Sequence, residues 1–257
     1  MRRLAIAAIA VSCLPIAAAV AQRQVVQKDN VRVSFGGRLL PHALPRERPA
    51  PVTVHLDGAV EAVDGGSPPR LREISVAVNR AGRLSVAGLP TCTAPELQQT
   101  SRERALALCR GALVGRGRWA AGVDSADAPS IPAGGSVLVF NSRRNGQPGM
   151  LLHLFGTRPV RAAFVIPFAI SRRSRGEFGT VLSAKIPKLA SDSGYVTDIE
   201  LTLGRRYRQG GEPRSFLSAS CAAPAGFPGA TYQLAKATFT FPELRLTSKL
   251  PGDCRVR

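Results

Sequence analysis

The chain has 257 residues, and its 35 Lys and Arg residues outnumber its 17 Asp and Glu residues, for a formal net charge of +18. Hydrophobic residues make up 44 % of the sequence, which excludes a disordered chain, and the length suffices for a sizeable core. A charge of this size bears on partners and solubility rather than on fold.

The first 21 residues have the pattern of a secretory signal peptide. Two arginines, Arg2 and Arg3, precede an apolar run from Leu4 to Val20, and Ala19 and Ala21 are the small residues of a cleavage site before Gln22. A membrane anchor would need about 20 uninterrupted apolar residues, and Pro15 breaks this run. Cleavage removes two arginines and no acid, so the formal net charge falls from +18 to +16.

Two alternatives to ordinary secretion remain open at this segment. Cys13 follows small residues, as in a lipoprotein processing site, although the residue three positions before it is Ala rather than Leu. Arg2-Arg3 is similar to a twin-arginine signal without its flanking residues. All three interpretations place the protein outside the cell or at its envelope. No later run is long and apolar enough to span a bilayer, so we expect no transmembrane helix in the mature chain.

The mature chain retains four cysteines, which in an exported protein predict disulfides. Of the three possible pairings, we favour the local one, Cys92 with Cys109 and Cys221 with Cys254. A metal site is the rival interpretation, but the CxxC and HxxxH spacings of zinc sites are absent.

The segment between Cys92 and Cys109 is the only convincing helical stretch. A single helix would hold the two cysteines roughly 25 Å apart, which exceeds disulfide reach. Two capping boxes, one at Thr93–Glu96 and one at Thr100–Glu103, instead predict two short helices with a bend near Thr100. This bend would return Cys109 to Cys92.

The rest of the chain has the alternation of half-buried β-strands. Residues 22–30 are polar and predict a loose N-terminus, and residues 31–257 predict one domain with a possible subdivision near 125–135. From residue 137 onward we predict strands at 137–140, 150–155, 160–170, 178–186, 195–207, 214–221 and 230–241. The first two are apolar on both faces, as expected of strands covered on both sides. The fold class predicted is mainly β, an antiparallel β-sandwich or partly open barrel with one short helical insertion.

The inventory of catalytic motifs is thin. No nucleophile elbow, metalloprotease, phosphate-loop or calcium-loop pattern occurs, so neither a metal nor a cofactor is predicted. His153 lies between Leu151 and Phe155 on one face of an apolar strand, which is typical of a hydrogen-bonded core histidine. Asp198 and Glu200 share a strand face, and we interpret them as part of a solvated surface.

The arginines of the C-terminal half cluster in sequence. If the strands form an up-and-down meander, the loops 141–149, 171–177 and 209–213 lie at one end of the sheet and the loops 157–159, 187–194 and 222–229 lie at the other. The first set, together with the adjoining strand ends, carries a net charge of +6, and the second carries +1. The sequence therefore predicts a basic end suited to polyanions, made of Arg143, Arg144, Arg172, Arg173, Arg175, Arg206, Arg208 and Arg214.

Arginine suits this role because its planar guanidinium binds carboxylate and phosphate through two hydrogen bonds. A GC-rich genome produces the same preference for Arg over Lys, so composition alone does not separate the two explanations. Nucleic acid is a less fitting partner than envelope polymers or lipid headgroups, because these loops offer few aromatics for base stacking.

Four short segments resemble a group of exported, disulfide-containing proteins of GC-rich Gram-positive bacteria for which no activity is known. They are Pro51–Leu56, Gly88–Cys92, Ala105–Cys109 and Leu113–Gly117. The resemblance implies secretion and paired cysteines.

We therefore expect an exported, non-catalytic binding or structural protein that acts through its basic surface on envelope polyanions or anionic headgroups. The alternative is a secreted hydrolase whose carboxylates converge only in three dimensions. Two facing carboxylates in a cleft, or an acid beside His153, would favour the enzyme.

Overall fold

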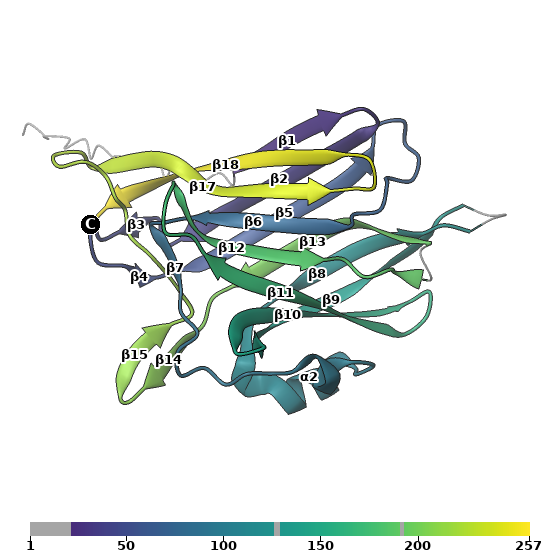
Figure 1. The fold of residues 1–257 in the computed structure, drawn as a ribbon, viewed down its shortest axis with the longest axis horizontal. Helices are drawn as coiled ribbons and strands as arrows, with labels where there is room; N and C mark the ends of the chain where they lie inside the picture. The colour runs from purple at the N-terminus through teal and green to yellow at the C-terminus, as the bar shows by residue number, and fades with distance from the viewer. Residues whose placement is uncertain (1–21, 126–128, 191–192) are drawn as a thin grey trace, which may run out of the picture.

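Strands dominate the computed structural model, which describes residues 22–125, 129–190 and 193–257 (Figure 1). Strands account for 62 % of the structure and helices for 7 %. In the N-terminal half the elements are β1 (Gln22–Lys28), β2 (Val31–Leu40), β3 (Ala43–Leu44), β4 (Ala50–Pro51), β5 (Thr53–Ala62), β6 (Glu73–Asn79), β7 (Gly82–Leu84), α1 (Ala94–Leu97), α2 (Arg102–Cys109), the short 3-10 helix η1 (Arg110–Ala112) and β8 (Leu113–Val123). In the C-terminal half they are β9 (Ile131–Arg144), β10 (Gln147–Arg158), β11 (Ala162–Arg172), β12 (Phe178–Lys185), β13 (Gly194–Leu203), β14 (Arg206–Gln209), β15 (Glu212–Ser215), β16 (Leu217–Ala219), β17 (Gly229–Thr240) and β18 (Arg245–Val256).

One large sheet forms the body of the molecule. Thirteen of the described strands join it in the order β1-β2-β5-β13-β8-β9-β10-β11-β12-β6-β17-β18-β3, and only the last pair is parallel. The sheet curls into a half-barrel, so that β1 contacts β18 from the other edge (Figure 1). The predicted mainly-β, antiparallel class with a short helical insertion is confirmed, and of the two predicted architectures the curled sheet corresponds to the partly open barrel.

The alternation of residues along each strand separates an interior face from an exterior face. On β13, Ile199, Leu201 and Leu203 face the interior, whereas Asp198 and Glu200 are exposed on the outside. A period of two places alternate side chains on opposite faces of a sheet, which is why this pattern predicts half-buried strands.

At one side of the half-barrel the sheet folds back on itself and packs tightly. Val33 and Phe35 of β2 belong to one buried cluster with Phe239 of β17 and Leu250 of β18. The rings of Phe35 and Phe239 meet edge to face with their centroids 6.3 Å apart. Strands distant along the sheet therefore share one core across the interior.

The helical insertion covers the outer face of the central strands. Leu138 and Phe140 of β9 and Leu151 of β10 form a buried cluster with α1 and α2. The insertion is held by the Cys92–Cys109 disulfide, whose Cα atoms are 5.7 Å apart. Two short helices with a break at Thr100, and strands apolar on both faces, are both confirmed.

Two small sheets lie apart from the large one. The first, in the order β4-β16-β7, joins three short strands from distant parts of the chain. The second is the hairpin β14–β15, which projects from the body (Figure 1). A second disulfide, Cys221–Cys254, links the segment after β16 to β18. Both predicted cysteine pairings are thus confirmed.

Two sequence-based expectations differ from the structure. Residues 22–28 form the edge strand β1, paired along its length with β2, instead of a loose N-terminus. Backbone hydrogen bonds hold β1 to β2 and do not require apolar side chains. The polar composition of residues 22–28 therefore did not predict a strand. The predicted meander holds only from β9 to β12, because β13 crosses over to lie between β5 and β8.

Some expectations concern residues outside the described part of the chain. The predicted signal peptide, residues 1–21, with Cys13, lies there. So do residues 126–128 of the possible subdivision near 125–135. On either side of that gap, Val123 of β8 pairs with Ile131 of β9 within one hairpin. None of the described helices is long and apolar enough to cross a membrane.

Candidate functional site

The topology brings the three arginine-bearing loops to one end of the sheet. Strands β9 and β11 run in the same direction because each is antiparallel to β10. Strand β13 runs in that direction too, because β13 and β9 are both antiparallel to β8. The turn after β9, the turn after β11 and the β14–β15 hairpin after β13 therefore lie at the same end.

A segment that crosses this end ties the three loops together. Leu84 accepts a hydrogen bond of 3.1 Å from Arg172 Nη2, and Ala87 accepts one of 2.7 Å from Tyr207 Oη. Further along, Ser142 Oγ donates to the carbonyl of Cys92 at 2.8 Å. Residues 84–92 thus contact β11, β14 and β9 in turn, so the loops belong to one continuous surface.

We call this surface the arginine-rich end. It consists of the eight predicted residues, all of which are exposed: Arg143, Arg144, Arg172, Arg173, Arg175, Arg206, Arg208 and Arg214. The hydrogen bonds observed for three of them go to backbone carbonyls, from Arg143 to Gly146, from Arg172 to Leu84 and from Arg208 to Gly211. No carboxylate in the described part of the chain forms an ion pair with any of the eight.

Local turn chemistry fixes the position of the first arginine pair. Arg143 and Arg144 end β9 directly before Asn145 and Gly146, which have φ angles of 50° and 76°. Asn-Gly is the preferred pair for such tight hairpins because both positions need positive φ. The turn therefore presents both arginines at the tip of the hairpin.

One predicted loop lies at the opposite end from the one expected. The loop 222–229 leads into β17, whose N-terminal part lies beside Asn79 at the C-terminal end of β6. That end of β6 pairs with the start of β12, next to the arginine-bearing loop 173–177. The expectation was wrong because residues 216–221 join the small β4-β16-β7 sheet instead of crossing the molecule. The loop adds no arginine to the surface.

The other end of the sheet has acids that are held in hydrogen bonds. Asn30 and the backbone N–H of Gly66 bind the carboxylate of Asp64, and these bonds lower its pKa, the Gly66 bond most. Ser67 and Ser130 donate to Asp124 and lower its pKa in the same way. The two ends therefore differ in charge, and only one is dominated by arginine.

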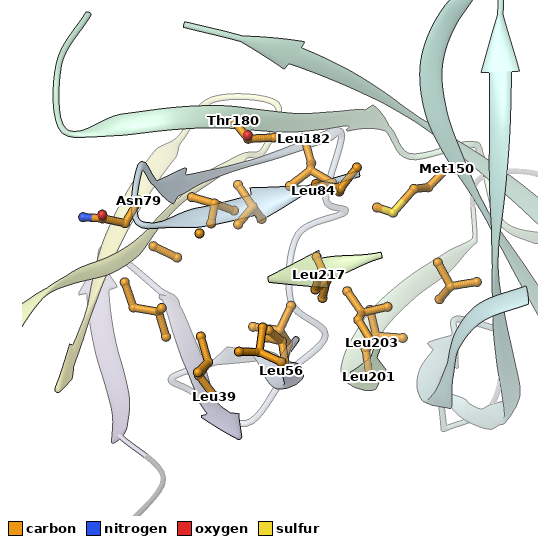
Figure 2. A pocket seen from close by; sticks show the side chains of 18 of the residues that line it. Leu39, Leu56, Asn79, Leu84, Met150, Thr180, Leu182, Leu201, Leu203 and Leu217 are labelled. Carbon is orange, nitrogen blue, oxygen red and sulfur yellow. The ribbon is translucent and has the colours of Figure 1, made fainter. Parts of the chain in front are cut away.

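Inside the half-barrel, at its arginine-rich end, lies an apolar cavity of about 190 Å³. Figure 2 shows Leu56, Leu201 and Leu203 on one side of this space and Leu84, Leu182 and Met150 on another, with Leu217 of β16 between them. The strands that supply these side chains are β5, β13, β7, β12, β10 and β16. We call this space the interior cavity.

The cavity lies against the small β4-β16-β7 sheet. Phe216 and Leu84 at that sheet are buried in the same cluster as Val139 and Leu152 of the large sheet. The polar side chains at the margin of the cavity include Asn79, Arg83, Thr180 and Ser218. Leaving a space of this size unfilled costs about 4 to 5 kcal/mol by the relation between cavity volume and stability. So large an apolar void is a candidate ligand site.

His153 has a structural environment. Its Nε2 lies 3.0 Å from the carbonyl oxygen of Thr100 and 3.1 Å from Thr100 Oγ1, at the break between α1 and α2. The side chain is fully buried, and this burial lowers its pKa below the ordinary value of 6.5. The observed hydrogen-bond partners contain no carboxylate, so the interpretation as a hydrogen-bonded core histidine holds.

A groove on the outer face contains a pair of acids. Asp57 of β5 and Glu200 of β13 are direct cross-strand partners, and both line this groove. Asp57 is paired with Arg23 at 2.8 Å and Glu200 with Arg118 at 2.7 Å. Glu200 thus lies on a solvated face among arginines, as the sequence predicts. The proximity of Asp57 was not expected, because Asp57 and Glu200 are 143 positions apart in the chain.

The glycines of Gly115-Arg116-Gly117-Arg118 serve strand packing. These residues lie within β8, and a Cβ atom on Gly117 would lie 1.8 Å from the carbonyl oxygen of Glu200. Only glycine permits this close approach of two backbones. The motif is therefore part of the curled sheet, in agreement with its rejection as a dinucleotide fingerprint.

Cys92, Cys109 and Glu96 lie within 4.8 Å of one another, but this group is explained without a metal. The two sulfurs are joined in a disulfide, and metal ligation requires thiolates. Glu96 accepts hydrogen bonds of 2.7 Å from the backbone N–H and the hydroxyl of Thr93, which completes the capping box of α1.

Comparison of the chain with protein-family models, with curated proteins and with solved structures gives no match. Sequence reasoning identified the arginine-rich end but missed the interior cavity. The sequence feature related to the cavity is the row of alternate apolar residues in β5, β12 and β13. This pattern predicts which face points inward, but it does not predict whether other side chains pack against that face.

Proposed function

We propose that this protein is an exported, non-catalytic binding protein whose arginine-rich end binds anionic groups at the cell envelope. The observation that carries the proposal is the convergence of eight exposed arginines, from three loops, at one end of the sheet. The ligand chemistry is phosphate or carboxylate, presented by an envelope polymer or by lipid headgroups, because guanidinium groups bind both through paired hydrogen bonds.

Several features support this proposal. The eight guanidinium groups have no carboxylate partner among the described residues, so they are available to an external anion. Two disulfides are typical of proteins in oxidising compartments, which supports export. The predicted signal peptide points the same way.

The proposal is tested by cosedimentation of the mature protein with anionic vesicles and, separately, with purified anionic envelope polymer. We expect binding to at least one of them, and we expect it to weaken steeply between 0.1 and 1 M salt, as the Debye length falls from about 10 to 3 Å. Comparison of the two materials distinguishes headgroup from polymer.

A pair of matched variants makes the test specific. Replacing Arg172, Arg173 and Arg175 with Gln should abolish binding. The control replaces Arg158, Arg161 and Arg245, which are exposed at the other end of the sheet, and changes the net charge by the same amount. Equal loss of binding in both variants would show that total charge, rather than this end, is responsible. Salt-independent binding would also contradict the proposal.

A secreted hydrolase is a second candidate, and one observation favours it. Asp57 and Glu200 face the same groove as direct cross-strand neighbours, and paired carboxylates perform glycoside hydrolysis. Each carboxylate is, however, engaged by its own arginine. Hydrolysis of a polysaccharide panel that is lost in both Asp57→Asn and Glu200→Gln would establish this candidate, and absence of hydrolysis in the unaltered protein would remove it.

A further inference from the structure

We propose that the interior cavity binds the aliphatic chain of a single-chain amphiphile, such as a medium-chain fatty acid, whose anionic head lies at the arginine-rich end. The chain assignment depends on the cavity alone. The assignment of the head rests on the proposed function of the arginines.

The first argument is that the inner wall keeps accessible apolar surface. Leu56, Leu182 and Leu201 point toward the cavity (Figure 2) and yet are only half-buried. Val139 of β9 and Leu152 of β10 also line the cavity and are buried, so the accessible apolar surface belongs to the side of the cavity formed by β5, β12 and β13. Apolar surface that is left uncovered inside a protein gains most from an apolar ligand, because water there finds few hydrogen-bond partners.

The second argument is the match between the volume of the cavity and a single short chain. A cavity of about 150 Å³ lined by Leu, Ile and Phe stays dry and binds benzene, which has six carbons. By the same measure, the 190 Å³ of the interior cavity holds roughly eight carbon atoms. This capacity suits one medium-length chain and is too small for the two long chains of a membrane phospholipid.

The third argument is the position of positive charge at the margin of the cavity. Arg83 of β7 lines the cavity and is exposed, and its cross-strand partner Ser218 lines it too. Arg172 donates to the carbonyl of Leu84, the residue after Arg83. A chain inside the cavity would therefore place an anionic head next to Arg83 and Arg172. Asp57 also lines the cavity, but its carboxylate is paired with Arg23.

The inference is tested by calorimetric titration of the disulfide-bonded mature protein with octanoate, octan-1-ol and butyrate. Octanoate and octanol should each bind with a stoichiometry of one. Butyrate should bind about 200-fold more weakly than octanoate, because it buries about four fewer methylene groups. Because burial of an apolar chain changes the heat capacity, the titration is done at two temperatures, and absence of heat from both eight-carbon ligands at both temperatures would overturn the inference.

Two cavity-filling variants locate the site. Leu201→Trp and Leu182→Phe should each lose at least about tenfold in affinity for both eight-carbon ligands, because the added ring occupies the space of the chain. If Leu201→Trp does not fold, Leu182→Phe provides the same test with a smaller change. Unchanged affinity in a folded filling variant would overturn the cavity as the site. As a matched control, Val25→Phe on the outer surface should bind both ligands like the unaltered protein.

Head-group variants separate this inference from the proposed function. Arg83→Gln together with Arg172→Gln should weaken octanoate about tenfold and leave octanol unchanged, because only the acid carries a charge. If octanol binds but these variants leave octanoate unaffected, the assignment of the head is wrong while the chain site stands. If salt-dependent envelope binding persists but neither ligand binds, this inference fails and the proposed function does not.

Discussion

The two faces of β9 and β10 are equally apolar and yet have different surroundings. On the outer face, Phe140 and Leu151 are buried beneath α1 and α2. On the inner face, Val139 and Leu152 border a cavity of about 190 Å³. Hydrophobic alternation therefore reports which way a residue points, whereas the completeness of packing depends on what the rest of the chain places opposite. The four predictions that follow test this difference, from the largest expected effect to the smallest.

Removal of a packed side chain from the outer face should have the largest effect. Phe140→Ala is expected to lower the free energy of unfolding by about 3–5 kcal/mol, because Phe140 is fully buried and its neighbours are held by a disulfide. Leu182→Ala on the cavity wall should cost about 2 kcal/mol, the lower end for such changes, because Leu182 is only half-buried. Urea denaturation measures both, and equal losses would show that the two faces are packed alike.

Loss of the insertion's disulfide should come next. Replacing Cys92 and Cys109 with Ala is expected to cost about 3 kcal/mol, since the bond closes a 17-residue separation. The Cys221–Cys254 bond closes 33 residues, so its loss should cost slightly more, about 3.7 kcal/mol. In the first variant, octanol binding should persist, because the insertion covers the outer face only. Loss of binding there would mean that the two faces are coupled.

Added volume should have opposite effects on the two faces. Ala105→Leu on the buried side of α2 is expected to destabilise the fold by about 1–3 kcal/mol, because Ala105 has no exposed surface and packs in the cluster with Leu138 and Phe140. Val54→Ile on the cavity wall should stabilise it by about 0.5–1 kcal/mol, as cavity-filling changes do, because Val54 lines the cavity and is only half-buried. Thermal unfolding measures both signs. Destabilisation by Val54→Ile would indicate that the inner face is already filled.

The smallest expected effect is a pH dependence on the outer face. Burial keeps the pKa of His153 below 6.5, so the unfolded chain binds a proton more readily than the folded protein does. The contribution of the neutral His153 to the free energy of unfolding is therefore fully present above pH 6.5. It is lost as the pH falls from 6.5 through the pKa of His153 in the folded state. His153→Gln should flatten this part of the stability curve.

His55 supplies the control for that measurement. Its pKa is also lowered, first by burial and then by the charge of Arg38, but its side chain is less buried than that of His153. His55→Gln should therefore leave most of the acid-side loss in place. If His55→Gln flattens the dependence of stability on pH and His153→Gln does not, then His153 on the outer face is not the cause of the loss of stability at acidic pH.

Local signals in the sequence were sufficient for much of the fold. The two helix-start signals predicted the break at Thr100, although α2 has Ser101 rather than Thr100 as its N-cap, and the preference for local pairing predicted the Cys92–Cys109 bond. These features depend on residues close together in the chain. Strand alternation likewise predicted the mainly-β class, because the pattern belongs to each strand separately.

Long-range pairing was beyond the reach of such signals. Nothing local indicates that β13 pairs with β5, or that β6 lies between β12 and β17. For that reason the pair Asp57 and Glu200, the interior cavity and the position of the loop 222–229 were not foreseen. The arginine-bearing loops nevertheless share an end, because each lies after a strand that runs in the same direction as β9.

The order of strands in the large sheet also has a consequence for the kinetics of folding. Strand β5 pairs with β13, which lies more than 130 positions later in the chain. Strand β6 pairs only with β12 and β17, which are also far from it in sequence. A domain dominated by such distant contacts is expected to fold in milliseconds to seconds, because closing long loops costs entropy before the paired strands contribute stabilising contacts. The β8–β12 meander, the β1–β2 hairpin and the β17–β18 hairpin pair residues that are close in the chain, so we expect them to form early and the β5–β13 and β6–β17 pairings to form later.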